Sequence, residues 1–418
     1  MTDDGVSGPA SDSSARLGSR RRTILVVLVA AAGVVALAGG AATLHLGTAP
    51  ATAPPVEMPR PPVSPDAAGS DASVDRPVVD IPSTIDATGT SDVIAPLQAA
   101  VDAAPDGSVV RFPPNAVYRI SVGLTLEHRH DLELDGRGAR LELDDGTAGR
   151  RRNLWLVEST GIRIGDLALV GANPRSGVFQ DDRQFEHGIW VDGGSDIEIT
   201  DVRIDRPWGD CLYLGDHDGA SDWASRIWFH DSSCEGAGRN GVAVVAARDV
   251  TIERNHIANI GYHAVDLEPN ETVPVQGAAR VAIVHNTVVG PVGQYFLAAN
   301  GWGPIDDLRV ENNTLEGTPL RVTVQPLPDS GYVRRDVLIS GNRSDTAYSI
   351  GGTAAMTFGR VVGLDVERNV APIDDGATSL ISLMDSCDVT ITGNQVSGGG
   401  REIDGRAGAC PIAQVEMR

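Results

Sequence analysis

A six-residue motif recurs along this chain of 418 residues and restricts its fold more than any other feature of the sequence. The motif reads hydrophobic, any residue, hydrophobic, any, any, Asn, and apolar residues two positions apart are typical of β-strands. Successive copies begin 23 to 35 residues apart. Weaker copies without the Asn begin at Leu132, Ile162, Ile197 and Ile227, and the complete copies occupy 250–255, 281–286, 308–313, 337–342, 364–369 and 389–394.

Short strands repeated at this interval stack into a solenoid, because each coil buries its apolar face only against its neighbours. Crossovers between parallel strands are right-handed by default. The sequence therefore predicts an all-β fold, a right-handed parallel β-helix of about ten coils. The Asn of each copy is expected to hydrogen-bond the coils above and below it, forming a ladder. Leucine-rich repeats also carry a regular Asn, but their Leu-x-x-Leu-x-Leu pattern is absent here.

The first coil of a solenoid needs a cap. Ser91 and Asp92 form an N-cap signal, and apolar residues follow them at helical spacing. We therefore expect a short N-terminal capping helix. Its apolar residues are Val93, Ile94, Leu97, Ala100 and Val101.

The segment 86–120 resembles the N-terminal part of rhamnogalacturonase/epimerase-type pectate lyase domains. The likeness rests on Asp86-Ala-Thr-Gly89, Asp92, Leu97-Gln98-Ala-Ala-Val101 and Phe112-Pro113. As architecture it extends over about residues 83–400. The resemblance implies a β-helix of the pectin-lyase-like superfamily.

The N-terminal part of the chain predicts a membrane anchor. Residues 24–46 contain no acid and no Arg, and at about 1.5 Å per residue they can cross a hydrocarbon core of about 30 Å. Three arginines at 20–22 precede them, which places residues 1–23 in the cytoplasm by the positive-inside rule. We therefore predict a cytoplasmic tail (1–23), a single transmembrane signal-anchor (24–46), a Pro-rich linker (47–82) and a β-helix domain (83–418) outside the cell membrane.

A cleaved signal peptide is the alternative to the anchor, since Ala36-Leu37-Ala38 offers a cleavage site. The domain would then be secreted. Either location permits disulfides, and the four cysteines form two local pairs, Cys211 with Cys234 and Cys387 with Cys410. Buried free cysteines remain the alternative.

Charge and composition exclude several function classes. The formal charge of -22 argues against a nucleic-acid partner, because binding there depends on neutralising phosphates. The chain contains no Lys, which excludes a Lys nucleophile and a Walker-type phosphate loop. No cofactor is indicated with certainty. The run Asp216-His217-Asp218-Gly219 with Asp222 could bind Ca²⁺ through its carboxylates, although it lacks EF-hand spacing and also fits a solvated loop.

Polar and aromatic residues gather on the strand that precedes the motif in each coil. Five such segments align, at 187–192, 210–215, 240–245, 263–268 and 294–299, with apolar residues at positions three and five. Those positions point inward, so positions four and six point outward. The residues that this alignment brings to one surface include the candidate catalytic residues Asp210, His263, Asp266 and Glu268, and the candidate substrate-binding residues His187, Trp190, Asp192, Tyr213, Arg239 and Asn240.

These residue types suit carbohydrate chemistry. Trp190 and Tyr213 offer flat faces that stack on sugar rings. Hydrolysis requires two carboxyl groups, and Asp210 and Asp266 fit as candidates. They lie two coils apart, about 9.6 Å along the axis, which is close to the separation in inverting glycosidases.

Elimination or epimerisation of a uronate requires a base and a cation on the substrate carboxylate, and His263 and Arg239 fit these roles. Each candidate also has a structural alternative: it caps a turn, pairs with a nearby charge or lies on a solvated face. The net acidity of the chain counts against a strongly anionic substrate unless Ca²⁺ or Arg screens it.

The same strands resemble those of polygalacturonases, which carry Asp-Gly, Asp-Asp-Cys and Gly-His-Gly motifs on successive coils. Here the corresponding segments are Glu186-His187-Gly188, Gly209-Asp210-Cys211 and Tyr262-His263-Ala264. Only Asp210-Cys211 matches closely, because Gly209 replaces the paired Asp and the Arg-Ile-Lys motif is absent. The chain therefore departs from standard polygalacturonase chemistry.

Two functions follow as hypotheses. The first is a membrane-anchored, extracytoplasmic enzyme that cleaves or modifies a polysaccharide, of the glycosidase or the lyase/epimerase type. The second is a non-catalytic surface module that binds a glycan or another cell-wall component. Fold alone does not decide between them.

Overall fold

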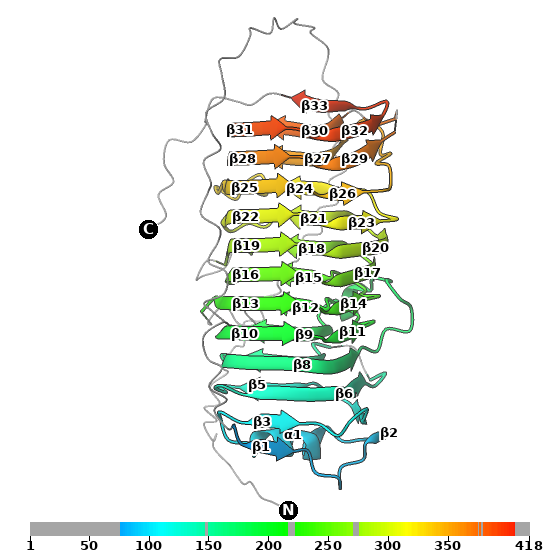
Figure 1. The fold of residues 1–418 in the computed structure, drawn as a ribbon, viewed down its shortest axis with the longest axis vertical. Helices are drawn as coiled ribbons and strands as arrows, with labels where there is room; N and C mark the ends of the chain where they lie inside the picture. Colours follow the sequence, from blue (N-terminus) through cyan, green and yellow to red (C-terminus); the bar gives the residue numbers. More distant parts are fainter. Residues whose placement is uncertain are drawn as a thin grey trace, which may run out of the picture. The chain divides into compact units, whose positions relative to one another are not determined.

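The computed structural model describes residues 76–146, 149–215, 222–270, 276–374, 376–377 and 379–405. The predicted membrane span 24–46 lies outside these ranges, as do the candidate calcium ligands at 216–219 and Cys410. In the described ranges, no helix is long and apolar enough to cross a membrane. These residues form a stack of parallel β-coils (Figure 1).

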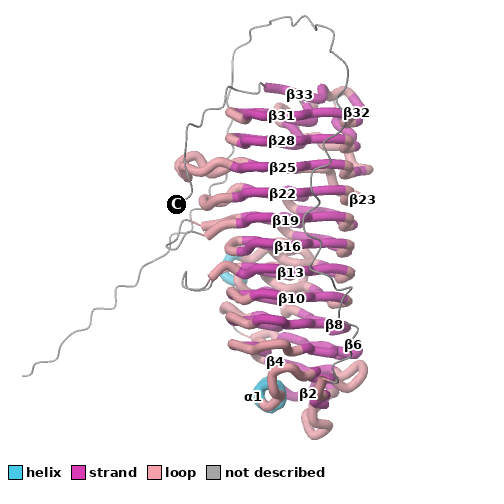
Figure 2. Tube along the Cα trace, turned by 60° about the vertical axis from the view of Figure 1, so that its left-hand side comes forward, coloured by secondary structure: helices cyan, strands magenta, loops and turns pink. Residues whose placement is uncertain are grey.

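Two rows of strands make up a 22-stranded sheet whose neighbours pair in parallel (Figure 2). Strands β6 (Glu133–Leu143) and β8 (Thr160–Val170) take part in both rows. The other strands of the first row are β1 (Val78–Asp80), β3 (Val109–Arg111), β10 (Ser195–Thr200), β13 (Ala224–His230), β16 (Ala247–Glu253), β19 (Ala278–Val284), β22 (Ile305–Glu311), β25 (Arg334–Ser340), β28 (Val361–Glu367) and β31 (Cys387–Thr392). The other strands of the second row are β2 (Thr88–Asp92), β4 (Val117–Ile120), β11 (Arg203–Asp205), β14 (Ser233–Glu235), β17 (His256–Ile260), β20 (Thr287–Val292), β23 (Thr314–Glu316), β26 (Arg343–Ser344), β29 (Val370–Ile373) and β32 (Gln395–Gly398).

The third row is a separate 11-stranded parallel sheet, which carries the candidate site. Its strands are β5 (Leu124–Glu127), β7 (Arg152–Val157), β9 (His187–Asp192), β12 (Leu212–Leu214), β15 (Val242–Val244), β18 (His263–Leu267), β21 (Tyr295–Ala299), β24 (Val322–Val324), β27 (Ala354–Gly359), β30 (Ser379–Met384) and β33 (Arg401–Gly405). The described residues thus form about one coil more than predicted, and β1 lies within the predicted linker range 47–82.

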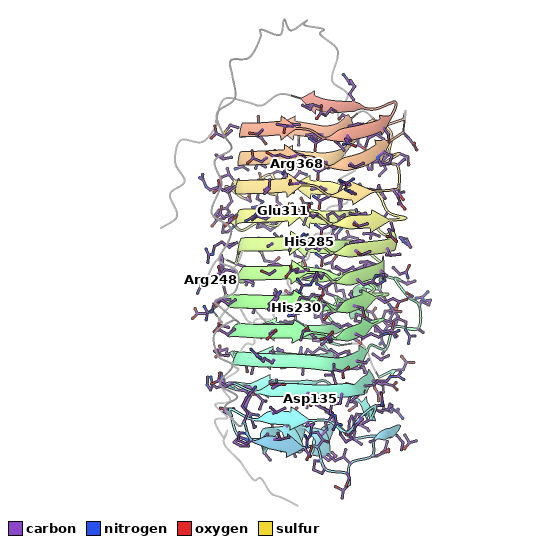
Figure 3. The ribbon with its side chains drawn as sticks, viewed as in Figure 1. Asp135, His230, Arg248, His285, Glu311 and Arg368 are labelled. Atoms are coloured by element: carbon purple, nitrogen blue, oxygen red, sulfur yellow. A yellow bond between two sulfur atoms is a disulfide. The ribbon has the colours of Figure 1, made fainter. Side chains whose placement is uncertain are left out.

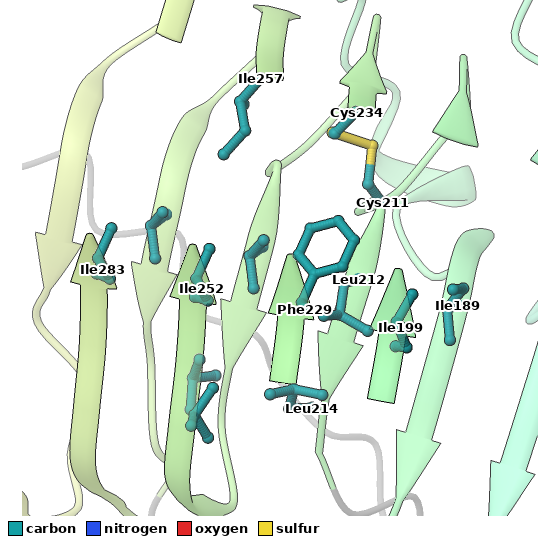
Figure 4. Packing of buried hydrophobic residues seen from close by; sticks show 14 of the residues in the cluster. Ile189, Ile199, Cys211, Leu212, Leu214, Phe229, Cys234, Ile252, Ile257 and Ile283 are labelled. Atoms are coloured by element: carbon teal, nitrogen blue, oxygen red, sulfur yellow. A yellow bond between two sulfur atoms is a disulfide. The ribbon is translucent and has the colours of Figure 1, made fainter. Parts of the chain in front are cut away.

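The sequence motif occupies the same place on every coil, the first row of the large sheet. Ile197 pairs with Ile162 on one side and with Ile227 on the other, and the later copies continue this register. The second apolar position of each copy also points inward, as Ile199, Phe229 and Ile252 show in Figure 4. These columns form one continuous core between the three rows.

The predicted asparagine ladder is confirmed. The side-chain amide of Asn313 donates to the Ile283 carbonyl at 2.8 Å and to Oδ1 of Asn342 at 2.8 Å. Its own Oδ1 accepts from the backbone N–H of Asn286 at 2.9 Å. The remaining members of the ladder repeat this pattern and are Asn255, Asn286, Asn342, Asn369 and Asn394.

The predicted pair Cys211–Cys234 is a disulfide (Figure 4). Cys211 directly precedes β12 and Cys234 lies on β14, so the bond joins the candidate-site row to the second row. The other predicted pair includes Cys410, which lies outside the described residues.

The predicted N-terminal helix is present as α1 (Ile94–Asp102), beside the first strands of the stack. It buries Leu97 and Val101 in the continuous core. Its N-cap residue is Val93 and not Asp92, whose Oδ1 instead accepts from the backbone N–H groups of Ile94 and Ser121. Asp92 thereby links the start of the helix to the residue that directly follows β4.

The outer face of the first row carries polar and charged side chains, including His230, Glu311 and Arg368 (Figure 3). A residue with left-handed backbone conformation stands just before each motif copy, and the strand register is the same on both sides of it. Oppositely charged neighbours in this column form ion pairs, such as Arg226 with Asp196 at 2.6 Å. Because both side chains are about half exposed, such pairs contribute little to stability.

Candidate functional site

The candidate residues lie on the outer face of the 11-stranded sheet, between β9 and β18. The predicted alignment of the first four strands is confirmed, since Leu212 pairs with Ile189 and with Val242, and Val242 pairs with Val265. The aligned first positions therefore form a row of His187, Asp210, Asn240 and His263.

The fifth predicted alignment is wrong by one residue. Val265 pairs with Leu297 and Asp266 with Ala298, so Tyr295 and not Gln294 continues the row from His263. The reason lies in the preceding strands, where the register of β17 and β20 shifts between Ala258 and Ile260. This irregularity adds a residue to the coil and displaces the strand that follows.

Small residues directly after the row allow the coils to approach closely. A Cβ on Gly188 would lie 2.7 Å from the carbonyl oxygen of Cys211, and a Cβ on Gly241 would lie 2.5 Å from that of Ala264. The His-Gly and Asn-Gly pairs of the sequence are thus explained by packing. Their role is to let the preceding polar residues lie on adjacent coils.

Asp210 is fully buried, and both of its carboxyl oxygens are hydrogen-bonded. Oδ1 accepts from the Asn240 backbone N–H at 2.8 Å, and Oδ2 accepts from Nη1 of Arg239 at 3.0 Å. Burial raises the pKa of Asp210 to about 7, although the Arg239 charge acts in the opposite direction. The carboxyl therefore retains a proton for much of the time near neutral pH.

Arg239 joins two carboxyl groups from different coils. Besides Asp210, its guanidinium donates through Nη2 to Oε1 of Glu268. The Arg239 side chain is 12% exposed and that of Glu268 is 29% exposed. Of the two sequence-based interpretations of Arg239, the structure shows pairing with nearby acids.

Asp266 and Glu268 lie two residues apart, with Asp266 on β18 and Glu268 just after it. Burial is the main cause that raises the pKa of Asp266 well above its usual value, and the charge of Glu268 is the next. A side-chain hydrogen bond with Glu268 acts in the same direction. Asn240 donates to Oδ2 of Asp266 at 3.3 Å, so one amide links the Asp266 carboxyl to the neighbouring coil.

Both candidate histidines are buried and uncharged. Nδ1 of His187 accepts from the backbone N–H of Asp210 at 3.0 Å, which leaves the proton on Nε2. Burial, followed by the charge of Arg239, lowers the pKa of His187 well below its usual value and that of His263 to about 3. Within the described residues, Nε2 of His187 and Nδ1 of His263 have no hydrogen-bond partner.

The predicted aromatic platform is less open than expected. Trp190 and Tyr213 point away from the main core, yet they are only 2% and 9% exposed. They form an outer apolar cluster with Ala243, Val245 and the partly buried Trp155. The ring of His187 stacks on Tyr213, with 4.7 Å between ring centroids. The expectation of two exposed stacking faces is therefore wrong, because side chains on neighbouring coils cover them.

Sequence reasoning missed one strand of the site. Arg152 on β7 pairs with His187, and Trp155 on the same strand pairs with Trp190. The signal was available, since the segment 152–157 has the same apolar pattern as 187–192. Asp192, at the far end of β9, is also buried, and its charge acts on Arg152.

The absence of an Asp-Asp pair has a steric reason. A Cβ on Gly209 would clash with the Gln184 carbonyl oxygen and would lie 2.8 Å from Nδ1 of His187. A second Asp before Asp210 therefore does not fit beside His187. The close packing around Gly209 therefore explains why this chain lacks the paired Asp of the polygalacturonase motif.

No group of three or more His, Cys, Asp or Glu side chains that could hold a metal ion occurs within the ranges that the structure describes. The predicted Ca²⁺ ligands Asp216, His217 and Asp218 lie outside those ranges, so this hypothesis stays a prediction.

Comparison with known proteins gives the same architecture. A family model described as "Right handed beta helix region" matches residues 183–315. No curated protein sequence matches the chain.

Several solved structures share the fold. The endo-xylogalacturonan hydrolase from Aspergillus tubingensis aligns with a TM-score of 0.59 at 14% identity, over 80% of this chain and 100% of that chain. The A-module of mannuronan C-5 epimerase AlgE6 from Azotobacter vinelandii gives a TM-score of 0.51 at 16% identity, over 77% of this chain and 87% of that chain. The Streptococcus pneumoniae surface protein and adhesin PfbA gives 0.51 at 14% identity, over 76% of this chain and 97% of that chain.

Identities this low establish the fold and nothing finer, and the fold is common to a hydrolase, an epimerase and an adhesin. The described domain is therefore a right-handed parallel β-helix.

Proposed function

We propose that the β-helix domain is an extracytoplasmic, carbohydrate-active enzyme that carries out acid–base chemistry on a polysaccharide. The observation that carries the proposal is the cluster of Asp210, Asp266 and Glu268 around the single guanidinium of Arg239. Buried carboxyl groups destabilise a fold unless they are neutralised or paired. Two buried carboxyl groups, Asp210 and Asp266, beside the partly exposed Glu268 therefore indicate a function beyond stability.

The raised pKa values of the buried carboxyl groups support a role in acid–base chemistry. The pKa of Asp210 is about 7 and that of Asp266 lies well above its usual value, in both cases chiefly through burial. Glu268 interacts with Arg239 and has exposed side-chain surface. A carboxyl group that holds and releases its proton near neutral pH, as Asp210 does, beside a second carboxyl with exposed surface, suits general acid–base catalysis.

Among the reaction types, the geometry favours hydrolysis. Elimination and epimerisation need a cation on the carboxylate of the reacting sugar, and Arg239 is already occupied by Asp210 and Glu268. We place the proton donor at the pair Asp266 and Glu268. The second carboxyl is Asp210, whose strand lies two steps, or about 9.6 Å along the axis, from that of Asp266, which is close to the carboxyl separation of inverting glycosidases. The Arg239 guanidinium binds both Asp210 and Glu268, so inversion requires this side chain to shift and admit a water.

The disulfide Cys211–Cys234 supports a location outside the cytoplasm, where thiols are oxidised. We propose that the predicted anchor at 24–46 holds the domain at the outer face of the cell membrane. The Pro-rich linker at 47–82 would then separate the two.

The test is an assay of the full-length protein on a panel of polysaccharides, with and without Ca²⁺. New reducing ends would support hydrolysis, and unsaturated products would favour elimination instead. We expect Asp266→Asn, Glu268→Gln and Asp210→Asn to abolish turnover, each with its fold and glycan binding intact. Asp135→Asn, on the first row of the large sheet (Figure 3), is the matched control and should keep full activity.

A second candidate function, a non-catalytic glycan-binding module, is favoured by the complete burial of Asp210 and the hydrogen bonds to both of its oxygens. Such a carboxyl also suits a structural brace. Binding of a polysaccharide without any product, in the wild type and in all three variants, would establish this function and exclude the enzyme.

A further inference from the structure

Two arginines beside the candidate site, Arg150 and Arg152, have guanidinium groups that contact no acid within hydrogen-bonding distance among the described residues. Arg150 and Arg152 form no ion pair and donate no hydrogen bond to any residue that the structure describes, and Nη1 of Arg152 is buried without an acceptor. Their immediate neighbour Arg151 differs, since it pairs with Asp144 at 3.1 Å and with Glu186 at 3.0 Å. The missing partners of Arg150 and Arg152 are thus not a general property of this segment.

Both guanidinium groups rest on aromatic rings. The guanidinium carbon of Arg152 lies 3.8 Å from the Trp155 ring centroid and 5.0 Å from that of Trp190, and that of Arg150 lies 5.0 Å from the Phe185 ring. Stacking on a ring fixes a guanidinium but leaves its in-plane N–H groups available to an anion. Arg150 is exposed and Arg152 is half-buried, so the pair is open on one side.

Arg150 and Arg152 place two positive charges close together. Burial lowers the pKa of Arg152 to about 10, the charge of Asp192 acts in the opposite direction, and the charge of Arg150 adds to the lowering. The charges of Arg239, Arg152 and Arg150 also contribute to keeping His187 neutral. A patch of this kind attracts an anion at close range even in a chain with a formal charge of -22.

We propose that Arg150 and Arg152 form a binding subsite for an acidic sugar unit, one that bears a carboxylate or a sulfate group. The inference rests on the proposed function, since it gives the polysaccharide at the carboxyl cluster an acidic character. Arg152 shares the row of His187, Asp210, Asn240 and His263, four strand steps before β18. At about 4.8 Å per step the subsite lies about 19 Å from the strand of Asp266 and about 9.6 Å from the position of Asp210, so it binds the polymer beyond the Asp210 side of the reacting bond.

The test is equilibrium binding to the full-length Asp266→Asn variant, which removes turnover as a complication. The probes are polygalacturonate, alginate, dextran sulfate and neutral dextran, at low and high salt. We expect one or more of the acidic polymers to bind, with affinity that falls as salt rises. The double variant Arg150→Gln/Arg152→Gln should weaken that binding at least about tenfold and remove most of its salt dependence. The carboxylate and sulfate probes distinguish the two acidic groups.

Two further variants keep the test interpretable. Arg163→Gln removes an exposed arginine on β8 and should leave binding unchanged, which controls for net charge. Arg152→Lys retains the charge without the planar fork and should bind better than Arg152→Gln. Equal binding of acidic polymers by the wild type and by the double variant would overturn the subsite.

The experiments distinguish failure of the subsite hypothesis from failure of the proposed enzymatic function. Binding of an acidic polymer that depends on Arg150 and Arg152, without turnover by the wild type, would support the subsite and exclude the proposed enzymatic activity. If a neutral polymer is turned over, and the wild type and the double variant turn it over equally well, the enzymatic activity is supported and the subsite is excluded.

Discussion

Arg239 donates from Nη1 to Oδ2 of Asp210 at 3.0 Å, and this contact ties the arginine before β15 to the aspartate before β12. The other arm of the same guanidinium holds Glu268. Three carboxyl groups therefore share one cation in a largely buried site, and the cluster as a whole stays near neutrality by retaining protons.

Replacing Arg239 by Gln should be strongly destabilising, because it leaves Asp210 buried without its cation. We expect a loss of about 3–5 kcal/mol of unfolding free energy at neutral pH, measured by denaturant titration. Arg226→Gln is the matched control, since its exposed pair with Asp196 is worth less than about 1 kcal/mol. Equal losses in both variants would contradict a special role for Arg239.

The contribution of Asp210 to stability should fall as the pH rises from about 4 towards 8. Asp210 titrates from 3.8 in the unfolded chain to about 7 in the fold, so the folded state binds its proton more tightly. That contribution is fully present below the unfolded value and is lost as the pH rises through the folded one. The raised pKa of Asp266 acts in the same direction. Unfolding free energies of the wild type minus those of Asp210→Asn isolate the effect, and a difference that is flat across this range would contradict it.

Substitutions in the Asn ladder should reduce the free energy of unfolding most in the middle of the ladder. Asn313→Leu removes two donors and an acceptor from buried partners and should cost about 1–3 kcal/mol. Asn394→Leu is the control at the same position of a terminal coil, where the side chain is only half-buried, and it should cost less. Thermal and denaturant unfolding measure both variants. A neutral Asn313→Leu would mean that the ladder does not contribute to stability.

Gly209 should not tolerate a side chain. Gly209→Ala places a methyl group against the Gln184 carbonyl and His187, so we expect a clear loss of stability and a disturbed site. Gly149→Ala is the matched control, because a Cβ there meets nothing within 4 Å. If the two alanine variants unfold at the same denaturant concentration, sterics do not explain the missing Asp-Asp pair.

The anchor prediction is tested on the natural protein. N-terminal sequencing of the mature form from membranes should find a chain that still contains residues 24–46. A mature N-terminus near residue 39 would instead establish the cleaved signal peptide and a secreted domain.

Much of the fold follows from local features of the sequence. The period-two pattern places Ile197, Ile227 and Val250 in one inward column, and the Asn after each copy forms the ladder. Each coil contacts mainly its two neighbours, so a repeated local pattern is enough to specify a solenoid. The same alignment places Asp210, Asn240 and Asp266 on adjacent strands.

The chemistry of the site depends on contacts that cross coils, and no local pattern encodes them. Whether Trp190 and Tyr213 are open or covered depends on side chains of other strands. The displacement at Tyr295 arises from a single irregularity between β17 and β20 that the motif spacing does not reveal.

The sequence by itself therefore determined the solenoid, its asparagine ladder and the row that carries the polar residues, whereas the structure decided between a Cys211–Cys234 disulfide and free cysteines. The tertiary structure decided that Arg239 binds Asp210 and Glu268, whereas Arg152 forms no ion pair with any described residue. The physical reason is the distance along the chain over which each interaction is specified. Backbone pairing and apolar burial repeat from coil to coil, whereas the partner of a buried charge depends on the three-dimensional placement of single side chains from distant parts of the chain.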